Sequence, residues 1–191
     1  MIKGNIKNGV RILAIEGSDL KEGKDCLVVC TIWRHDLLEG VISFYVKKDG
    51  SDSASKIISK VKRSRFKEQI KVIITHGTTI AGLNVIDIPK IYEQLKLPVI
   101  AITRKKPHPN LLSKAIFSSK TLSEEEKEKR LNLLNLIGKR SSMTSNGGYY
   151  AQFIGIKEQY AKIMIEEYAS KLRVSHIITS GISRGESRGR I

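Results

Sequence analysis

Cysteines and long apolar runs are what this chain of 191 residues lacks most. Its apolar runs are too short for a transmembrane helix, and residues 1–7 lack the continuous apolar segment of a signal peptide. The only cysteines are Cys26 and Cys30. In one strand they would stand about 13 Å apart, whereas a disulfide needs about 7 Å, and two cysteines alone make no metal site. We therefore expect free buried thiols in a soluble, cytoplasmic protein without a membrane partner.

Acidic residues are also scarce. The 34 Lys and Arg residues outnumber the 19 Asp and Glu residues, which gives a net charge of +15 and a pI near 9.9. This balance favours a polyanionic partner, with nucleic acid first and an anionic membrane surface second. The alternative is that the lysines serve solubility or surface ion networks. Charge does not separate DNA from RNA, and it leaves the oligomeric state open.

The length predicts a single domain over residues 1–191, with a short N-terminal extension over 1–10 and a basic C-terminal tail over 181–191. Apolar runs predict three early strands, the second and third of them antiparallel and joined through the polar residues 34–36. Helical spacing of apolar residues predicts a helix after Asp52. The early strands are expected at 11–16, 25–32 and 40–46.

The most informative stretch is a β-α-β unit over residues 72–104. Two short β-branched runs, 72–75 and 99–102, flank an amphipathic helix, which is typical of parallel strands covered by helices. Ligands of such sheets bind outside the carboxyl ends of the strands. His76 and Arg104 both fall at that edge, which predicts a site there.

The second half of the chain continues in the same alternating manner. An apolar stretch over 111–117 precedes a helix that a capping box opens at Ser123 and that Gly138 ends. A strand over 149–154, a long amphipathic helix and a last strand over 174–179 are expected to follow. This order predicts an α/β fold with a mixed sheet and helices on both faces, as in the ribonuclease H-like folds.

Several motifs together resemble one family. The motifs are Arg11-Ile-Leu-Ala-Ile-Glu-Gly17, Asp49-Gly-Ser-Asp-Ser-Ala54, His76-Gly-Thr-Thr-Ile-Ala-Gly-Leu-Asn84, Leu97-Pro-Val-Ile-Ala-Ile-Thr-Arg104 and Ser180-Gly-Ile-Ser-Arg-Gly-Glu-Ser-Arg-Gly-Arg190. They are similar to the archaeal family called "domain of unknown function 99", a group of uncharacterised proteins related to endonuclease V. The likeness runs from about Arg11 to the C-terminus. It implies a ribonuclease H-like fold and a divalent-metal nuclease site.

The resemblance also implies two metal-binding Asp positions, and this chain departs from both. Glu16 stands where an Asp is usual on the first strand, and His76 stands where an Asp precedes the Gly. Glu moves the carboxylate outward by one methylene, and His removes a negative charge from a site that must hold Mg²⁺. The pair Glu16 and His76, with Glu186 as a third candidate ligand, either holds one divalent metal such as Mg²⁺ or Mn²⁺, or holds none.

Two further carboxylates have simpler explanations. Asp52 is a candidate catalytic residue beside Glu16 and His76, but N-capping of the helix that follows is the better explanation, and the same holds for Asp87. Glu16 itself sits where an ordinary charge at a strand end is common, and His76 where an imidazole would bond the turn.

Basic residues at two places are predicted to contact phosphates. One group leaves the strand that ends near 103, and the other lies in the C-terminal tail. They are Arg104, Lys105 and Lys106 in the first group and Arg184, Arg188 and Arg190 in the second. Such contacts position a nucleic-acid backbone without reading its sequence. Trp33, Tyr149 and Tyr150 are candidates for base stacking, although core packing is their usual role.

Three hypotheses follow from these observations. The first is a metal-dependent endonuclease that uses Glu16 and His76. The second, which we favour, is a nucleic-acid-binding protein whose metal site is impaired or altered. The third is a protein–protein scaffold whose charge serves solubility alone. A steep fall of nucleic-acid affinity with salt separates the first two from the third.

Overall fold

A seven-stranded mixed sheet forms the centre of the computed structural model, which describes residues 9–19, 25–104, 109–138, 142–144 and 148–188. The strand order is β3-β2-β1-β4-β7-β9-β8, and a separate two-stranded sheet pairs β5 with β6. The strands are β1 (Arg11–Gly17), β2 (Cys26–Arg34), β3 (Leu37–Val46), β4 (Ile70–His76), β5 (Thr79–Ile80), β6 (Asn84–Val85), β7 (Val99–Thr103), β8 (Ser142–Thr144) and β9 (Tyr150–Ile154). The helices are α1 (Ser53–Arg63), α2 (Ile88–Leu95), α3 (Pro109–Phe117), α4 (Glu124–Gly138) and α5 (Glu158–Arg188).

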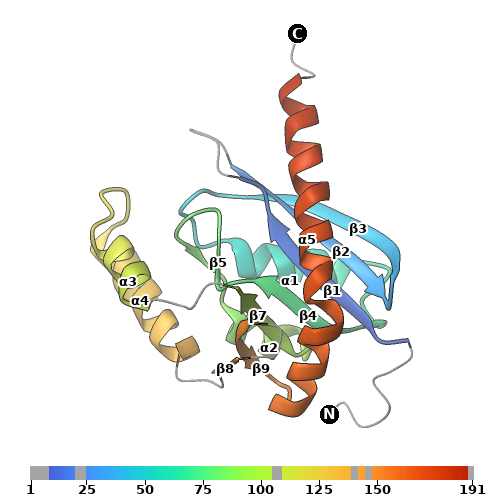
Figure 1. Ribbon diagram of the computed structural model, residues 1–191. Helices are drawn as coiled ribbons and strands as arrows, with labels where there is room; N and C mark the ends of the chain where they lie inside the picture. The colour runs from blue at the N-terminus through green and yellow to red at the C-terminus, as the bar shows by residue number, and fades with distance from the viewer. Residues whose placement is uncertain (1–8, 20–24, 105–108, 139–141, 145–147, 189–191) are drawn as a thin grey trace.

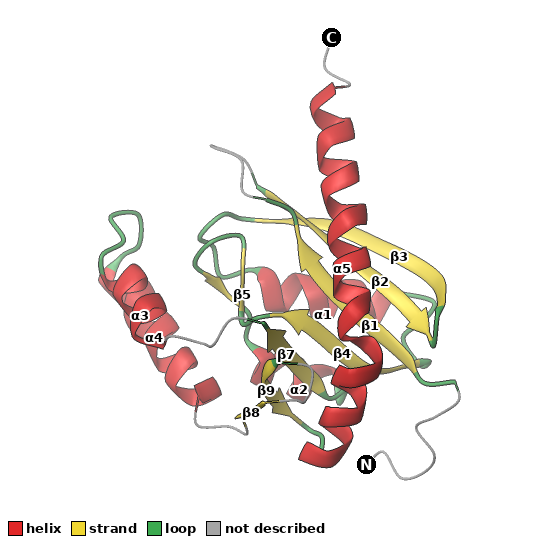
Figure 2. Cartoon of the chain, in the orientation of Figure 1, coloured by secondary structure: helices red, strands yellow, loops and turns green. Residues whose placement is uncertain are grey.

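Helices lie on both faces of this sheet, as the sequence predicted (Figures 1 and 2). Two expected pairings are also confirmed: β2 runs antiparallel to β3, and β4 runs parallel to β7. In addition, β1 pairs antiparallel with β2 and parallel with β4. β4 and β7 are parallel because the helix α2 crosses over between them. Within the described part of the chain, no helix is long and apolar enough to cross a membrane.

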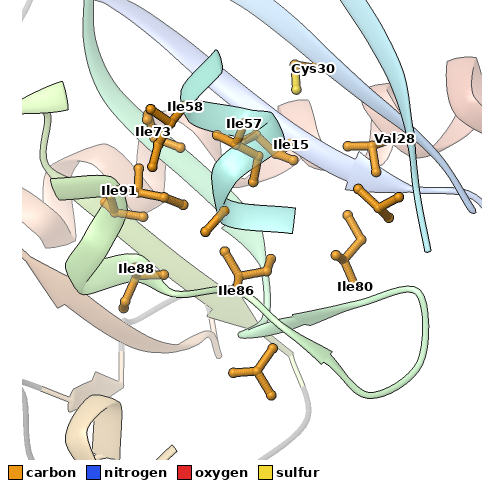
Figure 3. Close-up of a cluster of buried hydrophobic side chains, with 14 of the residues drawn as sticks. Ile15, Val28, Cys30, Ile57, Ile58, Ile73, Ile80, Ile86, Ile88 and Ile91 are labelled. Carbon is orange, nitrogen blue, oxygen red and sulfur yellow. The ribbon is translucent and has the colours of Figure 1, made fainter. Parts of the chain in front are cut away.

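Each face of the sheet has its own hydrophobic core. On one face, alternate strand residues such as Ile15, Val28 and Ile73 pack against α1 and α2 (Figure 3). On the other face, Ile12, Ile74 and their neighbours pack against α5. Both cores follow from the pleat of the strands, which sends successive side chains to opposite faces.

Cys26 and Cys30 are free and buried in the core that α1 and α2 cover, so the prediction of unbridged thiols is confirmed. Burial raises the pKa of both thiols above the ordinary value. A protonated, enclosed thiol is a poor nucleophile. The two cysteines therefore serve packing.

Local signals in the sequence explain where two helices begin. Asp87 accepts a hydrogen bond from the backbone N–H of Lys90 at 2.8 Å, so its role as the N-cap of α2 is confirmed. At α4 the Ser123 hydroxyl accepts from the N–H of Glu126, and the Glu126 carboxylate accepts from the N–H of Ser123. This reciprocal pair is the predicted capping box.

The prediction of a last strand over 174–179 is wrong. These residues lie inside α5, which runs without a break from Glu158 to Arg188. The β-branched run misled the prediction, because Val174 and Ile177 are exposed while Ser175 and Thr179, one helical turn apart, are fully buried. The helix also includes residues 181–188, which were expected to form a tail. Its last turns project beyond the sheet (Figure 1).

Candidate nucleic-acid site

The candidate site lies at the carboxyl ends of the parallel strands, on the face that α5 covers. In β1, β4 and β7 the even-numbered residues Ile12, Ile74 and Ile102 face α5. By the same alternation Glu16 at the end of β1 and His76 at the end of β4 face α5 as well. Register brings them together, because β1 and β4 are hydrogen-bonded neighbours.

Glu16 and His76 are in direct contact. The imidazole Nδ1 of His76 lies 3.3 Å and 3.2 Å from the two carboxylate oxygens of Glu16. The Glu16 side chain is only 10% exposed, whereas that of His76 is 56% exposed. The hydrogen bond to Glu16 raises the pKa of His76 above its ordinary value and outweighs burial, which acts in the opposite direction.

A second imidazole, which the sequence analysis missed, approaches the same carboxylate. His176 on α5 places its Nδ1 4.0 Å from Oε1 of Glu16. The expected strand over 174–179 hid this residue. Helical spacing would have shown it, because His176 follows the buried Leu172 by four residues and so lies on nearly the same face of α5.

A pocket of about 340 Å³ opens between these groups and α5. Its polar lining consists of Glu16, His76, Thr103, Arg104, Tyr149, Ser170, Arg173 and His176. Arg104 donates two hydrogen bonds to the Tyr149 hydroxyl, at 3.2 Å and 2.9 Å, and its guanidinium lies 5.2 Å from the centre of that ring. Arg104 and Arg173 make this pocket cationic, and the contacts with Tyr149 fix the orientation of the Arg104 guanidinium.

A second pocket, of about 420 Å³, lies on the opposite side of the Glu16–His76 pair. It shares Glu16, His76 and Thr103 with the first pocket, but Ile15 and Ile86 belong to the core under α1 and α2. Its remaining lining combines the apolar Ile80 and Ala81 with small or polar residues, which are Gly17, Ser18, Asp19, Gly77, Thr79 and Gly82. Two hollows of different chemistry therefore flank one carboxylate–imidazole pair.

Asp52 lines neither pocket. Its carboxylate forms an ion pair with Lys56 at 2.7 Å and accepts hydrogen bonds from Asn84 and from the backbone N–H of Lys47. Burial would raise the pKa of Asp52, but these partners outweigh burial and lower it. The capping prediction is wrong in one detail: Asp52 occupies the N-cap position of α1, but its side chain makes no capping hydrogen bond.

The other predicted site residues lie apart or outside the described residues. Lys105, Lys106 and Arg190 fall outside them. For Arg184, Glu186 and Arg188 only the helical backbone is described. At about 1.5 Å per residue, the backbone of Glu186 lies about 15 Å along α5 from His176, which separates it from the Glu16–His76 pair in this structure. Trp33 is buried in the core beneath α5 and is not available for stacking.

The donor set does not fit the divalent-metal nuclease site that the resemblance implied. Among the described residues, no three His, Cys, Asp or Glu side chains are grouped so that they would hold a metal ion. Glu16, the one carboxylate that both pockets share, already faces two imidazoles. Mg²⁺ prefers oxygen ligands in octahedral geometry, and a single carboxylate between two nitrogen donors does not offer them.

Known proteins resemble this chain over nearly its whole length. The family model described as Endonuclease dU matches residues 8–183. A "UPF0215 protein" of Archaeoglobus fulgidus is 32% identical over 186 residues, which covers 94% of this chain and 97% of the relative. Another from Methanothermobacter thermautotrophicus is 33% identical and covers 96% of this chain and 93% of the relative.

Three solved structures have a similar fold over most of this chain. A protein of unknown function from Archaeoglobus fulgidus superimposes with a TM-score of 0.80 at 28% identity, over 91% of this chain and 98% of the other. Human endonuclease V gives 0.59 at 11% identity, over 94% and 86% of the two chains. Ciona intestinalis endonuclease V, solved with a 24-mer DNA that contains inosine, gives 0.52 at 6% identity, over 85% and 78%. The predicted α/β fold and its likeness to endonuclease V are confirmed.

Proposed function

Because this chain belongs to the endonuclease dU family, we propose that it binds nucleic acid across the edge of the sheet at Glu16 and His76, and that its metal site is altered. The observation that carries the proposal is the pocket that combines two guanidinium groups, Arg104 and Arg173, with that pair. Guanidinium groups bind phosphate through paired hydrogen bonds. A net charge of +15 adds long-range attraction for a polyanion.

In this proposal each of the two pockets binds a different part of the nucleic acid. The cationic pocket under α5 receives the sugar-phosphate backbone, which fixes position without reading sequence. The polar pocket beside Gly17 and Gly77 offers small side chains and backbone groups to one displaced base. The description of the family names deoxyuridine, so DNA that contains deoxyuridine is the ligand that we propose.

A second candidate function is cleavage of that DNA at the same place, which the family description favours. The Glu16–His76 pair has the geometry to exchange a proton with a bound group, since the imidazole is within hydrogen-bond reach of the carboxylate. We favour binding, because within the described part of the chain no group of side chains makes the site that metal-assisted cleavage requires.

The experiment measures binding of labelled duplexes of about 20 base pairs, with and without one deoxyuridine, at roughly 50 and 200 mM salt. Wild type is compared with Arg104→Gln/Arg173→Gln and with Lys129→Gln/Lys157→Gln, a control that removes the same charge elsewhere. We expect the first variant to lower the slope of log affinity against log salt by about 2, and the control to leave affinity for the deoxyuridine duplex nearly unchanged. Equal binding by all three proteins would overturn the proposed site.

Cleavage is followed in the same samples with EDTA, Mg²⁺ or Mn²⁺, using Glu16→Gln as the test variant. Metal-dependent cutting that disappears in Glu16→Gln would establish the second candidate function. Salt-sensitive binding without cutting by wild type would establish a binding protein.

A further inference from the structure

A basic groove lies between α1 and α2, on the face of the sheet opposite α5. The groove has a volume of about 410 Å³. Apart from Ile58, its lining consists of Ser55, Ser59, Lys62, Arg63, Lys90 and Gln94. It therefore combines hydroxyl groups, cations and one amide, and no carboxylate lines it. Such a lining supplies hydrogen-bond donors and positive charge to a bound anion.

Helical spacing builds this groove from two facing rows. Ser55, Ser59 and Lys62 follow one another by four and three residues, so they share one side of α1. Lys90 and Gln94, four residues apart, form the facing row on α2. The Lys62 Nζ donates to the Gln94 Oε1 at 3.1 Å, which joins the two rows across the groove.

The charge around the groove is strongly one-sided. Residues 53–71 hold seven Lys or Arg residues and a single acid, Glu68, for a net charge of +6. Lys56 is ion-paired with Asp52, and Lys67 with Glu68. In the described part of the chain, the three cations that line the groove have no carboxylate partner, although Glu93 lies next to Gln94 in α2. Lysines that only solvate a surface need no hollow of this kind.

We propose that the α1–α2 groove binds the sugar-phosphate backbone of a second nucleic-acid duplex. The partner class rests on the proposed function, but the groove is separate from the candidate site. The groove shares no lining residue with either pocket of the candidate site, and the sheet stands between the groove and the cationic pocket under α5 that receives the backbone. A short straight duplex therefore occupies one surface or the other, so the chain holds two duplexes at once.

The test counts short duplexes, of about 12 base pairs, bound per chain by sedimentation velocity, and follows their salt dependence by fluorescence anisotropy. The groove variant is Lys62→Gln/Arg63→Gln/Lys90→Gln, and the site variant is Arg104→Gln/Arg173→Gln. A control, Lys129→Gln/Lys157→Gln/Lys162→Gln, removes three exposed cations from elsewhere. All these residues are exposed, so we expect each variant to fold. Circular dichroism and a urea titration check this.

We expect two duplexes per wild-type or control chain, and one per chain of either test variant. One duplex per wild-type chain, lost in the site variant and kept in the groove variant, would overturn the groove and leave the proposed function standing. One duplex lost only in the groove variant would overturn the candidate site and leave the groove. Binding of polyglutamate in place of any duplex would assign the groove to an acidic protein and overturn the proposal.

Discussion

Glu16 is a carboxylate enclosed at the end of a strand, with two imidazoles close to its oxygens. Its side chain is 10% exposed, and the nearest nitrogen atoms of His76 and His176 lie 3.2 Å and 4.0 Å from its oxygens. A carboxylate so enclosed is costly unless hydrogen bonds compensate for lost water. His76 provides that compensation, and the two residues behave as one unit.

Replacing Glu16 by Gln turns a charge-assisted hydrogen bond into a neutral one and removes the negative charge, and these hold the pKa of His76 above its ordinary value of 6.5. We therefore expect the pKa of His76 in Glu16→Gln to fall toward that value. Titration of the imidazole protons by NMR measures the shift. Glu68→Gln, which changes an 85%-exposed carboxylate, is the control and should leave His76 unchanged. An unaltered His76 in Glu16→Gln would contradict the contact.

The same contact makes stability depend on pH in a fixed direction. Because the pKa of His76 is raised in the folded state, its contribution is complete below pH 6.5 and is lost as pH rises through the raised value. We expect the difference in unfolding free energy between wild type and Glu16→Gln to shrink across that interval. Urea titrations at several pH values measure it, and a difference that grows with pH would contradict the assignment.

Among the elements, α4 is attached to the rest of the molecule by a buried cation in addition to apolar side chains such as Ile137. Arg130 is 4% exposed, and its guanidinium donates to the backbone carbonyls of Asp49, Gly50 and Leu83, at 2.6 Å, 2.9 Å and 3.1 Å. These carbonyls belong to the turn before α1 and to the loop between β5 and β6. One side chain thus ties α4 to both turns.

We expect Arg130→Ala to lower the free energy of unfolding by about 3 kcal/mol, because it leaves three carbonyls without their charged donor. Arg130→Lys should recover only part of this loss, since an ammonium lacks the planar fork. Lys129→Ala, the exposed neighbour, should change stability by about 0.5 kcal/mol or less. Urea denaturation checks all three, and a neutral Arg130→Ala would show that the loops do not need this anchor.

At the scale of the whole molecule, α5 closes one side of the sheet by itself. Met164, Tyr168 and Leu172 are buried in that core together with Trp33. A chain of hydrogen bonds reinforces the contact: the Trp33 Nε1 donates to the Thr31 hydroxyl, which lies 2.5 Å from the Ser175 hydroxyl. The sheet and α5 are therefore expected to unfold together.

Leu172→Ala should destabilise the protein by about 3 kcal/mol through the cavity that it leaves. Trp33 is the only tryptophan, so its fluorescence reports the contact between α5 and the sheet, while far-UV circular dichroism reports all elements. We expect the two signals to change at the same urea concentration in wild type and in the variant. Separate transitions would show that α5 detaches before the sheet unfolds.

The elements that could be predicted from the sequence are those whose signals lie within a few neighbouring residues. The apolar runs of β1 and β4, the caps at Asp87 and Ser123 and the β-α-β unit were all predicted, because each is encoded within a few residues. The strands β5, β6 and β8 were missed, since two or three residues carry no periodicity. The end of α5 was mistaken for a strand, and His176 was lost from the site with it.

The long reach of α5 also determines when this molecule can fold. Ser175 contacts Thr31, a partner 144 positions earlier in the chain. While a ribosome makes the protein from its N-terminus, the side chains Ile12, Ala14 and Trp33 remain exposed to solvent until α5 has been synthesised. Contacts between residues so far apart in sequence slow folding, and hydrophobic surface that promotes aggregation stays exposed until they form. During synthesis, a chaperone that shields this face would protect the nascent chain from aggregation.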